Sequence, residues 1–259
     1  LGLLKLLKSL GMSNAKIVAT GAAITPAYIK DWYKKLGIHL IEAYGMTEVC
    51  GSMTNSPMRD YPADSVGKSI PRGEVKIHPE TGEILMKSPY MMAGYYKEPE
   101  MTATVLIDGW MHSGDKGELD ENGFLKVIGR VKDAFKTSKG SYVTPNPLEE
   151  VLGKNDYIEQ VCVVGLGIPQ PVAVVNLSEI GLAADKSVVE TSLQQSLQDL
   201  NQTVANYERV STMVIDPNPW NETNGLLTPT LKVRRGAIDD AYGRDYLGWH
   251  EGKEKVVWI

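Results

Sequence analysis

The segment Glu42–Glu48, with the sequence EAYGMTE, gathers side chains that could bind a nucleotide. The ring of Tyr44 could pack against a purine, and Gly45 would let the backbone approach a ligand closely. The Thr47 hydroxyl could donate to a phosphate, and the Glu48 carboxylate could hold Mg2+. In isolation the pattern is more typical of a polar turn with a packed tyrosine, so this segment alone predicts no function.

Several further polar motifs follow in order along the chain. They are Ser113-Gly114-Asp115 after Gly109-Trp110, Gly129–Asp133 (GRVKD), Lys139-Gly140, Leu148-Glu149-Glu150 and Thr228–Arg234 (TPTLKVR). This series resembles the acyl-adenylate-forming (AMP-binding) superfamily, which includes acyl-CoA synthetases, luciferases, aryl-CoA ligases and the adenylation domains of peptide synthetases. The stretch LTPTLKVRR is similar to the version found in long-chain fatty acyl-CoA synthetases, with leucine in place of the more usual glycine before the lysine.

The resemblance implies nucleotide-binding roles for residues in the first half of the chain. It implies that Tyr44 flanks the adenine, that Asp115 accepts hydrogen bonds from the ribose hydroxyls, and that Arg130 donates to the same ribose. It also implies that Thr47 contacts the α-phosphate as part of the catalytic apparatus, and that Glu48 binds Mg2+. The remaining members of this expected nucleotide and acyl pocket are Gly21, Ala22, Ala23, Glu42, Ala43 and Gly45.

In the second half of the chain, the resemblance identifies Lys232 as the principal catalytic residue. An ammonium directed at the α-phosphate would stabilise charge that develops in the transition state of adenylation. Lys132 matches the position of a hinge about which the C-terminal domain swings between two poses. After that rotation we expect Lys136 to meet the nucleotide phosphate and Lys139-Gly140 to lie near coenzyme A.

The implied reaction converts a fatty acid or other carboxylic acid, ATP and coenzyme A into acyl-CoA, AMP and pyrophosphate. The expected cofactors are therefore ATP or AMP, Mg2+ and, as a co-substrate, coenzyme A. Two alternatives stay open: an enzyme that loads an acyl-carrier protein, and a non-catalytic binding relative. The superfamily's phosphate loop rich in glycine, serine and threonine has no match here. We therefore expect the N-terminal part of the enzyme to be absent, and a peripheral membrane association through that part stays open.

Strand and helix signals alternate in the first 65 residues. An apolar run at 17–20 is followed by the small-residue turn 21–23, and Thr25-Pro26 predicts a helix cap and first turn before a helix at 27–36. Residues 38–44 alternate as a strand would. From 66 to 129, short strands at 73–78, 81–88 and 116–129 predict a β-rich subdomain, with a hairpin turn at Asn122-Gly123.

The pattern after residue 130 predicts a separate α+β domain. A helix at 147–153 precedes apolar strands at 158–165 and 171–178. Further on come a long helix from about residue 187, a strand at 210–215 and a short terminal helix. The helix carries one apolar face of Val189, Leu193, Leu197, Leu200 and Val204. We therefore expect an α/β plus α+β protein, with the end of a large AMP-binding domain at 1–130 and a mobile C-terminal domain at 131–259.

Composition excludes several classes of function. Hydrophobic residues make up 42% and charged residues 23%, which is typical of a globular protein. The net charge of −5 argues against nucleic-acid binding, which needs a clustered positive surface. Cys50 and Cys162 have no metal-site spacing, which favours a reducing compartment and predicts a cytoplasmic protein. The apolar helix expected at 1–10 is too short to span a bilayer.

Overall fold

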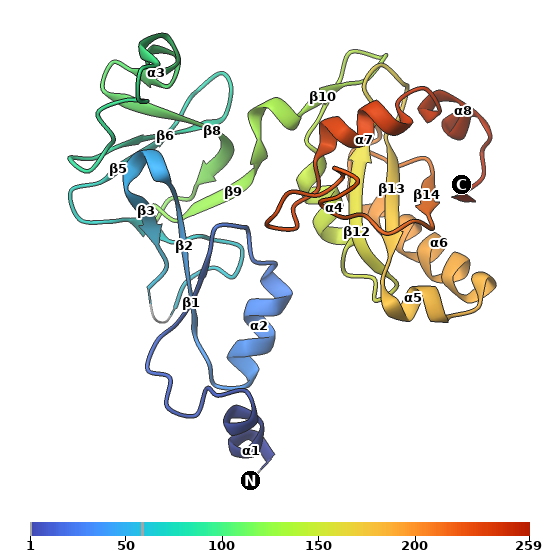
Figure 1. The fold of residues 1–259 in the computed structure, drawn as a ribbon, viewed down its shortest axis with the longest axis horizontal. Coiled ribbons are helices and arrows are strands. Elements are labelled where there is room, and N and C mark those ends of the chain that lie inside the picture. Colours follow the sequence, from blue (N-terminus) through green and yellow to red (C-terminus); the bar gives the residue numbers. More distant parts are fainter. Residues whose placement is uncertain (1, 58–59) are drawn as a thin grey trace. The chain divides into compact units, whose positions relative to one another are not determined.

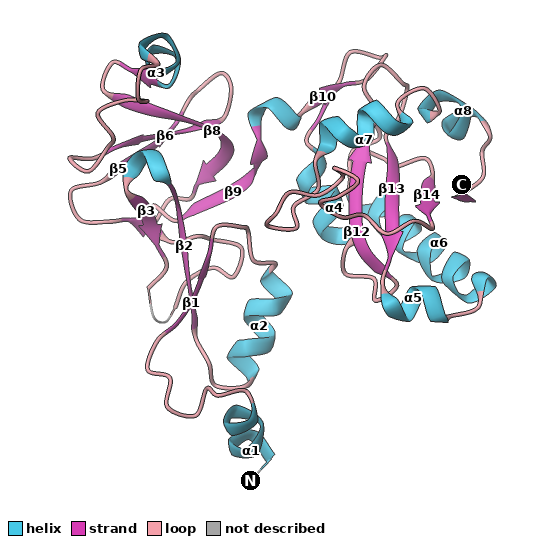
Figure 2. Ribbon diagram, in the orientation of Figure 1, coloured by secondary structure: helices cyan, strands magenta, loops and turns pink. Residues whose placement is uncertain are grey.

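The computed structural model describes residues 2–57 and 60–259, and its chain divides into two compact units (Figure 1). The first unit ends at Val131, and the second is Lys132–Ile259. Both units contain helices and strands, as the secondary-structure colouring of Figure 2 shows. The mixed α/β architecture expected from the sequence is confirmed.

The first unit begins with a four-stranded sheet in the order β1-β2-β3-β4. Strands β1 and β2 are parallel, whereas β3 and β4 continue the sheet in antiparallel pairing. The predicted strand–helix–strand order is confirmed. The elements are α1 (Gly2–Ser9), β1 (Val18–Gly21), α2 (Ala27–Lys35), β2 (Leu40–Met46), the short 3-10 helix η1 (Thr47–Val49), β3 (Gly51–Asn55) and β4 (Lys68–Ser69).

A second, antiparallel sheet fills the rest of the first unit, as the short strand signals predicted. Strand β8 is central and pairs with β6, β7 and β9 along different parts of its length. The hairpin between β8 and β9 turns at Gly123, whose φ of 79° lies in the left-handed region that glycine favours. The elements are β5 (Glu74–Ile77), β6 (Glu83–Lys87), α3 (Pro99–Val105), β7 (Leu106–Ile107), β8 (Trp110–Leu119) and β9 (Leu125–Arg130).

The second unit is built on the sheet β12-β13-β14-β15, with a small ladder of β10 and β11 beside it in the chain. Strands β12 and β13 are antiparallel, and β13, β14 and β15 are parallel. The short 3-10 helix η2 (Val131–Asp133) spans the boundary between the units. The elements after it are β10 (Phe135–Lys136), β11 (Tyr142–Val143), α4 (Pro145–Leu152), β12 (Ile158–Val164), β13 (Val172–Leu177), α5 (Glu179–Ala183), α6 (Lys186–Thr203), β14 (Met213–Asp216), α7 (Arg235–Tyr242), α8 (Tyr246–Glu251) and β15 (Val256–Trp258).

Both faces of this second sheet are buried, which explains why its strands are almost continuously apolar. Successive residues of a strand point to opposite faces, so Val163 joins one hydrophobic cluster and its neighbour Cys162 joins the other. Helices α4 and α6 cover the first face, and α7 and α8 cover the second. The expected apolar stripe of α6 is buried in the first cluster.

Three local expectations are wrong in detail. Thr25 does not cap α2: the cap position is Pro26, and the backbone N–H of Thr25 donates instead to Glu42. Val204, expected in the stripe of α6, lies one residue past the end of that helix. The chain also returns to the sheet after its last helix as β15, a strand that the sequence did not suggest. None of the described helices is long and apolar enough to cross a membrane.

The core of the second unit gives a direct test of this packing. Leu193 of α6 is fully buried, whereas Val188 of the same helix is 47% exposed. We expect Leu193→Ala to lower the free energy of unfolding by about 2–5 kcal/mol, because it removes buried methyl groups and leaves a cavity. Val188→Ala should change it by no more than about 0.5 kcal/mol. Urea unfolding followed by circular dichroism measures both, and equal losses would contradict the described burial.

Candidate functional site

Three residues that lie far apart in the sequence meet in the first unit. The hydroxyl of Tyr44, near the end of β2, donates to Oδ2 of Asp115 in β8 at 2.8 Å. Nε of Arg130, the last residue of β9, lies 3.1 Å from the other carboxylate oxygen of Asp115. Asp115 and Arg130 are direct cross-strand partners, so the β8–β9 hairpin itself brings them together. We call Tyr44, Asp115 and Arg130 the carboxylate triad.

Burial and charge determine which group of the triad donates. Burial raises the pKa of the Tyr44 hydroxyl well above its usual range, and the nearby negative charge of Asp115 raises it further. The hydroxyl therefore stays protonated and acts as the donor to Asp115. The Arg130 side chain is 64% exposed, whereas that of Asp115 is 16% exposed. Each oxygen of a carboxylate has two acceptor positions, so a carboxylate is suited to accept from several donors at once.

Strand β2 requires glycine at position 45, the residue after Tyr44. The β2–β3 ladder shifts register between Tyr44 and Gly45, and a Cβ on Gly45 would lie only 1.7 Å from the carbonyl oxygen of Gly51. No side chain fits there without moving the backbone of β3. Strand β2 ends one residue later, and η1 follows directly. In η1, Thr47 is exposed and Glu48 is half-buried.

The Glu48 carboxylate has a tyrosine partner that the sequence did not suggest. The hydroxyl of Tyr95 donates to Oε1 of Glu48 at 2.8 Å, and this hydrogen bond raises the pKa of Tyr95. No cluster of three or more His, Cys, Asp or Glu side chains that could hold a metal occurs among the described residues. A single carboxylate nevertheless fits Mg2+, which is usually held by one or two carboxylates together with substrate phosphates.

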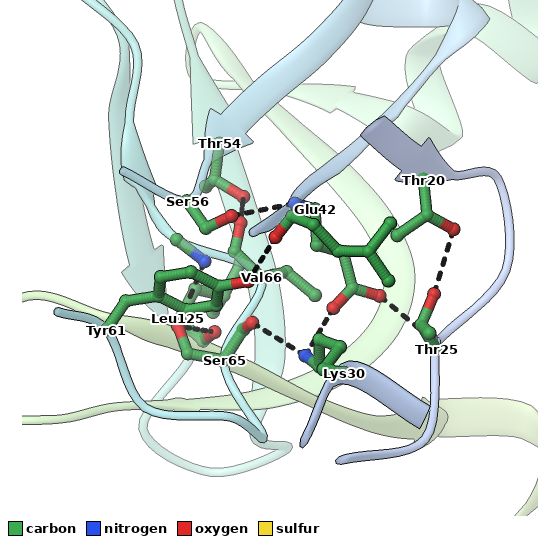
Figure 3. A network of polar contacts seen from close by, with 12 residues as sticks. Thr20, Thr25, Lys30, Glu42, Thr54, Ser56, Tyr61, Ser65, Val66 and Leu125 are labelled. Atoms are coloured by element: carbon green, nitrogen blue, oxygen red, sulfur yellow. Dashed lines mark hydrogen bonds and ion pairs between the residues drawn. The ribbon is translucent and has the colours of Figure 1, made fainter. Parts of the chain in front are cut away.

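Glu42 lies in the predicted motif, and its side chain enters a buried network of polar contacts (Figure 3). Its Oε2 lies 2.5 Å from the ammonium of Lys30, and both side chains are at most 5% exposed. Its Oε1 accepts the backbone N–H of Thr25 at 2.8 Å. Glu42 therefore holds α2 and the turn before it against β2, and its predicted contact with a nucleotide stays a prediction.

The sequence analysis did not identify Lys30 as a buried residue, although its position in the helical repeat indicated burial. Pro26, Ile29, Lys30 and Tyr33 follow the spacing of one helix face, and that face is the covered one. A lysine on a covered face needs an anionic partner, and Glu42, 12 residues further along the chain, is that partner. The nitrogen of Lys30 also donates to the carbonyl of Ser65 at 3.2 Å.

The small-residue turn after β1 is exposed, as a ligand-lining turn would require. Gly21 pairs with Ala43 across the parallel strands β1 and β2, and a Cβ on Gly21 would lie 3.0 Å from the carbonyl oxygen of Ala43. Ala22 has a φ of 66°, in the left-handed region that disfavours residues with a Cβ. The structure thus brings the turn 21–23 beside Ala43, and the roles of these residues stay predictions.

Lys232 stands in a tight exposed loop of the second unit. The backbone N–H of Lys232 donates to the Thr228 hydroxyl at 3.0 Å, and the N–H of Thr228 donates to the Lys232 carbonyl at 2.8 Å. Leu231 between them has a φ of 59° and is 67% exposed. A leucine in this conformation is strained, which gives a physical reason why glycine is the usual residue before the lysine.

The predicted hinge lies where the two units divide. Lys132, the first residue of the second unit, is exposed in η2, directly after β9 ends at Arg130. Lys136 follows in β10, with its ammonium 5.6 Å from the centre of the Tyr142 ring. Lys139 and Gly140 form the turn between β10 and β11, where Gly140 has a φ of 87°. Their predicted contacts with phosphate and coenzyme A stay predictions.

Comparison with known families and sequences gives a consistent match. The model of the AMP-binding enzyme family matches residues 4–96, and the model of the AMP-binding enzyme C-terminal domain matches residues 132–245. A long-chain-fatty-acid CoA ligase of Mycobacterium bovis is 29% identical over 93% of this chain and 43% of that protein. Long-chain-fatty-acid CoA ligase 5 of Mus musculus is 30% identical over 89% of this chain and 38% of that protein. The chain thus spans less than half the length of these relatives.

Solved structures show the same fold. The adenylation domain of a carboxylate reductase from Mycobacterium chelonae aligns with a TM-score of 0.75 at 23% identity, over 93% of this chain and 40% of that one. An anthranilate CoA ligase in complex with anthranoyl-AMP aligns with a TM-score of 0.72 at 20% identity, over 89% of this chain and 45% of that one.

The buried pair beneath the motif yields a prediction about stability. Lys30→Met should lower the free energy of unfolding by about 3–5 kcal/mol, because it leaves the Glu42 carboxylate buried without its cation. Adding Glu42→Leu to Lys30→Met should restore much of that loss, because the uncompensated charge is then gone. Denaturant unfolding of the single and double variants measures both. A single variant as stable as the original protein would contradict the buried pair.

Proposed function

This chain belongs to the AMP-binding enzyme family, and from that premise we propose that it forms the C-terminal part of an ATP-dependent fatty acyl-CoA synthetase. In the proposed reaction, the acid's carboxylate attacks the α-phosphorus of ATP, and pyrophosphate leaves to give an acyl-adenylate. The thiol of coenzyme A then loses its proton and attacks the acyl carbon, and AMP leaves. The names of the relatives support a long-chain fatty acid as the substrate.

The carboxylate triad is the observation that carries this proposal. It brings together one residue from each of three motifs, from β2, β8 and β9, around a single carboxylate. Asp115 would accept the ribose hydroxyls of ATP or AMP, and Arg130 would donate to the same ribose. The ring of Tyr44, held by its hydrogen bond to Asp115, would flank the adenine. The whole triad would thus fix the nucleoside before any chemistry occurs.

The phosphates would meet the segment that follows. Thr47, exposed in η1, would donate its hydroxyl to the α-phosphate. Glu48 would hold Mg2+ with its carboxylate, kept in place by the hydrogen bond from Tyr95. A bound Mg2+ would supply positive charge to the phosphate oxygens. Gly45 allows this segment to pass close to β3, so η1 begins at a defined place.

Lys232 would serve the first half-reaction from the second unit. Negative charge grows on the α-phosphate oxygens as the acid attacks, and an ammonium placed there stabilises the transition state more than the ground state. The hydrogen bonds between Thr228 and Lys232 limit the freedom of the loop that carries it. Before the second half-reaction, rotation at Lys132 would move Lys232 away from the nucleotide. Lys136 would then face the phosphate, and Lys139 and Gly140 would lie near coenzyme A.

The first functional prediction concerns Lys232. In the full-length enzyme, Lys232→Ala should slow acyl-adenylate formation by about 100- to 1000-fold, because one preorganised electrostatic contact is lost. Transfer from supplied acyl-adenylate to coenzyme A should stay nearly unchanged. Pyrophosphate exchange measures the first step, and acyl-CoA formation from synthetic acyl-AMP measures the second.

Two comparisons make this experiment decisive. Lys154→Ala removes another exposed lysine of the second unit and should leave both steps intact. Lys232→Arg should not restore adenylation, because the planar guanidinium is bulkier and directs its charge differently. Equal damage to both steps by Lys232→Ala would indicate a structural role for this lysine and would overturn its assignment.

A second prediction concerns the hinge. Lys132→Pro in the full-length enzyme should reduce thioester formation far more than adenylation, because proline fixes φ near −65° and restricts rotation at that residue. Lys132→Ala, which keeps the backbone free, should be less damaging than proline to thioester formation. The same two half-reaction assays measure the effect. An equal loss in both steps, or in neither, would show that the chain does not rotate here.

A further inference from the structure

The ladder between β6 and β8 is irregular beside Asp115. Glu83 pairs with Lys116, and Leu85 pairs with His112, so two steps along β6 correspond to four along β8. Ser113, Gly114 and Asp115 therefore form a bulge opposite β6. Such a bulge redirects side chains, and it deprives its own backbone groups of regular ladder partners. The N–H groups of the bulge need other acceptors, since an unpaired buried N–H is costly.

Two side chains supply those acceptors. Oε1 of Glu83 accepts the N–H of Gly114 at 2.8 Å. The Ser113 hydroxyl accepts the N–H of Asp115 at 3.0 Å and donates to the carbonyl of Ile84 at 2.7 Å. Gly114 has a φ of 72°, a left-handed conformation that glycine adopts without a Cβ penalty. The peptide between Ser113 and Gly114 is thus held by the Glu83 carboxylate, and the next peptide, between Gly114 and Asp115, is held by the Ser113 hydroxyl.

The second oxygen of Glu83 is also engaged. Oε2 of Glu83 lies 2.8 Å from Nδ1 of His112, and the two side chains are 15% and 21% exposed. His112, which lies in the neighbouring strand β8, thereby restrains the Glu83 carboxylate. Glu83 itself stands at the start of β6, whose next residues, Ile84, Leu85 and Met86, are buried. The carboxylate is therefore held in two ways: its strand is buried beside it, and its Oε2 contacts His112.

We propose that Glu83 is a positioning residue for the nucleotide: by holding the Gly114 N–H, it fixes the bulge that aims the Asp115 carboxylate at the ribose. This inference rests on the proposed function, in which Asp115 accepts the ribose hydroxyls. In this role Glu83 acts through the backbone N–H of Gly114. Its removal should therefore weaken recognition of the ribose and leave the other nucleotide contacts in place.

The test compares AMP with 2′,3′-dideoxy-AMP, which lacks the ribose hydroxyls. In the full-length enzyme we expect AMP to bind about tenfold to a hundredfold more tightly than the dideoxy nucleotide, because Asp115 accepts those hydroxyls. Glu83→Met keeps the side chain's length but offers no acceptor, so the ratio of the two Kd values should fall toward one. Its Kd for the dideoxy nucleotide should match that of the original enzyme. Isothermal titration calorimetry measures each Kd.

Conservative and control variants separate positioning from general damage. Glu83→Gln keeps an oxygen that can accept the Gly114 N–H and should preserve the ratio. Glu74→Met replaces an exposed carboxylate on the neighbouring strand β5 and should also preserve it. If Glu83→Met does not fold, Glu83→Asp decides in its place, because the shorter side chain withdraws the acceptor and should reduce the ratio.

The outcomes distinguish this inference from the proposed function. A preserved ratio in a folded Glu83→Met variant, or in Glu83→Asp where that variant decides, would overturn the positioning role and leave the proposed function standing. A loss in Glu83→Gln as large as in Glu83→Met would likewise overturn the acceptor role. An original enzyme that binds AMP and dideoxy-AMP equally would overturn the ribose contact of Asp115, and the inference would fall with it.

Discussion

The hydrogen bond from the Tyr44 hydroxyl to the Asp115 carboxylate is the contact on which the first unit's polar architecture depends. It joins β2 of the first sheet to β8 of the second, and it turns two separate sequence motifs into one site. Hydrogen bonds to a charged partner contribute about 1.5–3 kcal/mol, more than neutral ones. The apolar side chains beneath it, including Met53, Met86 and Met111, form one buried cluster shared by both sheets. A charged contact over a dry core is both strong and geometrically defined.

Irregular backbone occurs at three of the positions to which we assign function. The β2–β3 ladder shifts at Gly45, the β6–β8 ladder bulges at Asp115, and Leu231 holds a left-handed conformation next to Lys232. Each departure costs free energy that regular strands would not. Each also places a polar side chain where a regular ladder would not direct it. The surrounding contacts, from Glu83 to the bulge and from Thr228 to the loop, hold these conformations.

The second unit combines a rigid sheet with an exposed loop. Its sheet is buried on both faces, so the strands have little freedom to move relative to their helices. The loop of Lys232 joins this body at Arg235, the first residue of α7, whose guanidinium lies 2.8 Å from the Glu149 carboxylate and donates to the carbonyl of Val163. Lys232 thus lies three residues before a half-buried ion pair. Such an attachment limits how far the start of α7 can shift relative to the sheet.

The sequence by itself determined the local elements and the family, because both are written in short-range patterns. Four-residue spacing identified the buried face of α6, Asn122-Gly123 identified the hairpin, and the ordered motifs identified the AMP-binding family. Only the tertiary structure decided the partners of Glu42, the acceptor role of Glu83 and the return of the chain as β15. Those features join segments distant along the chain: Lys30 with Glu42, Glu83 with Gly114, and β14 with β15. A pattern within one element cannot encode which distant side chain satisfies a buried charge or a bulged N–H, because that depends on how the elements pack.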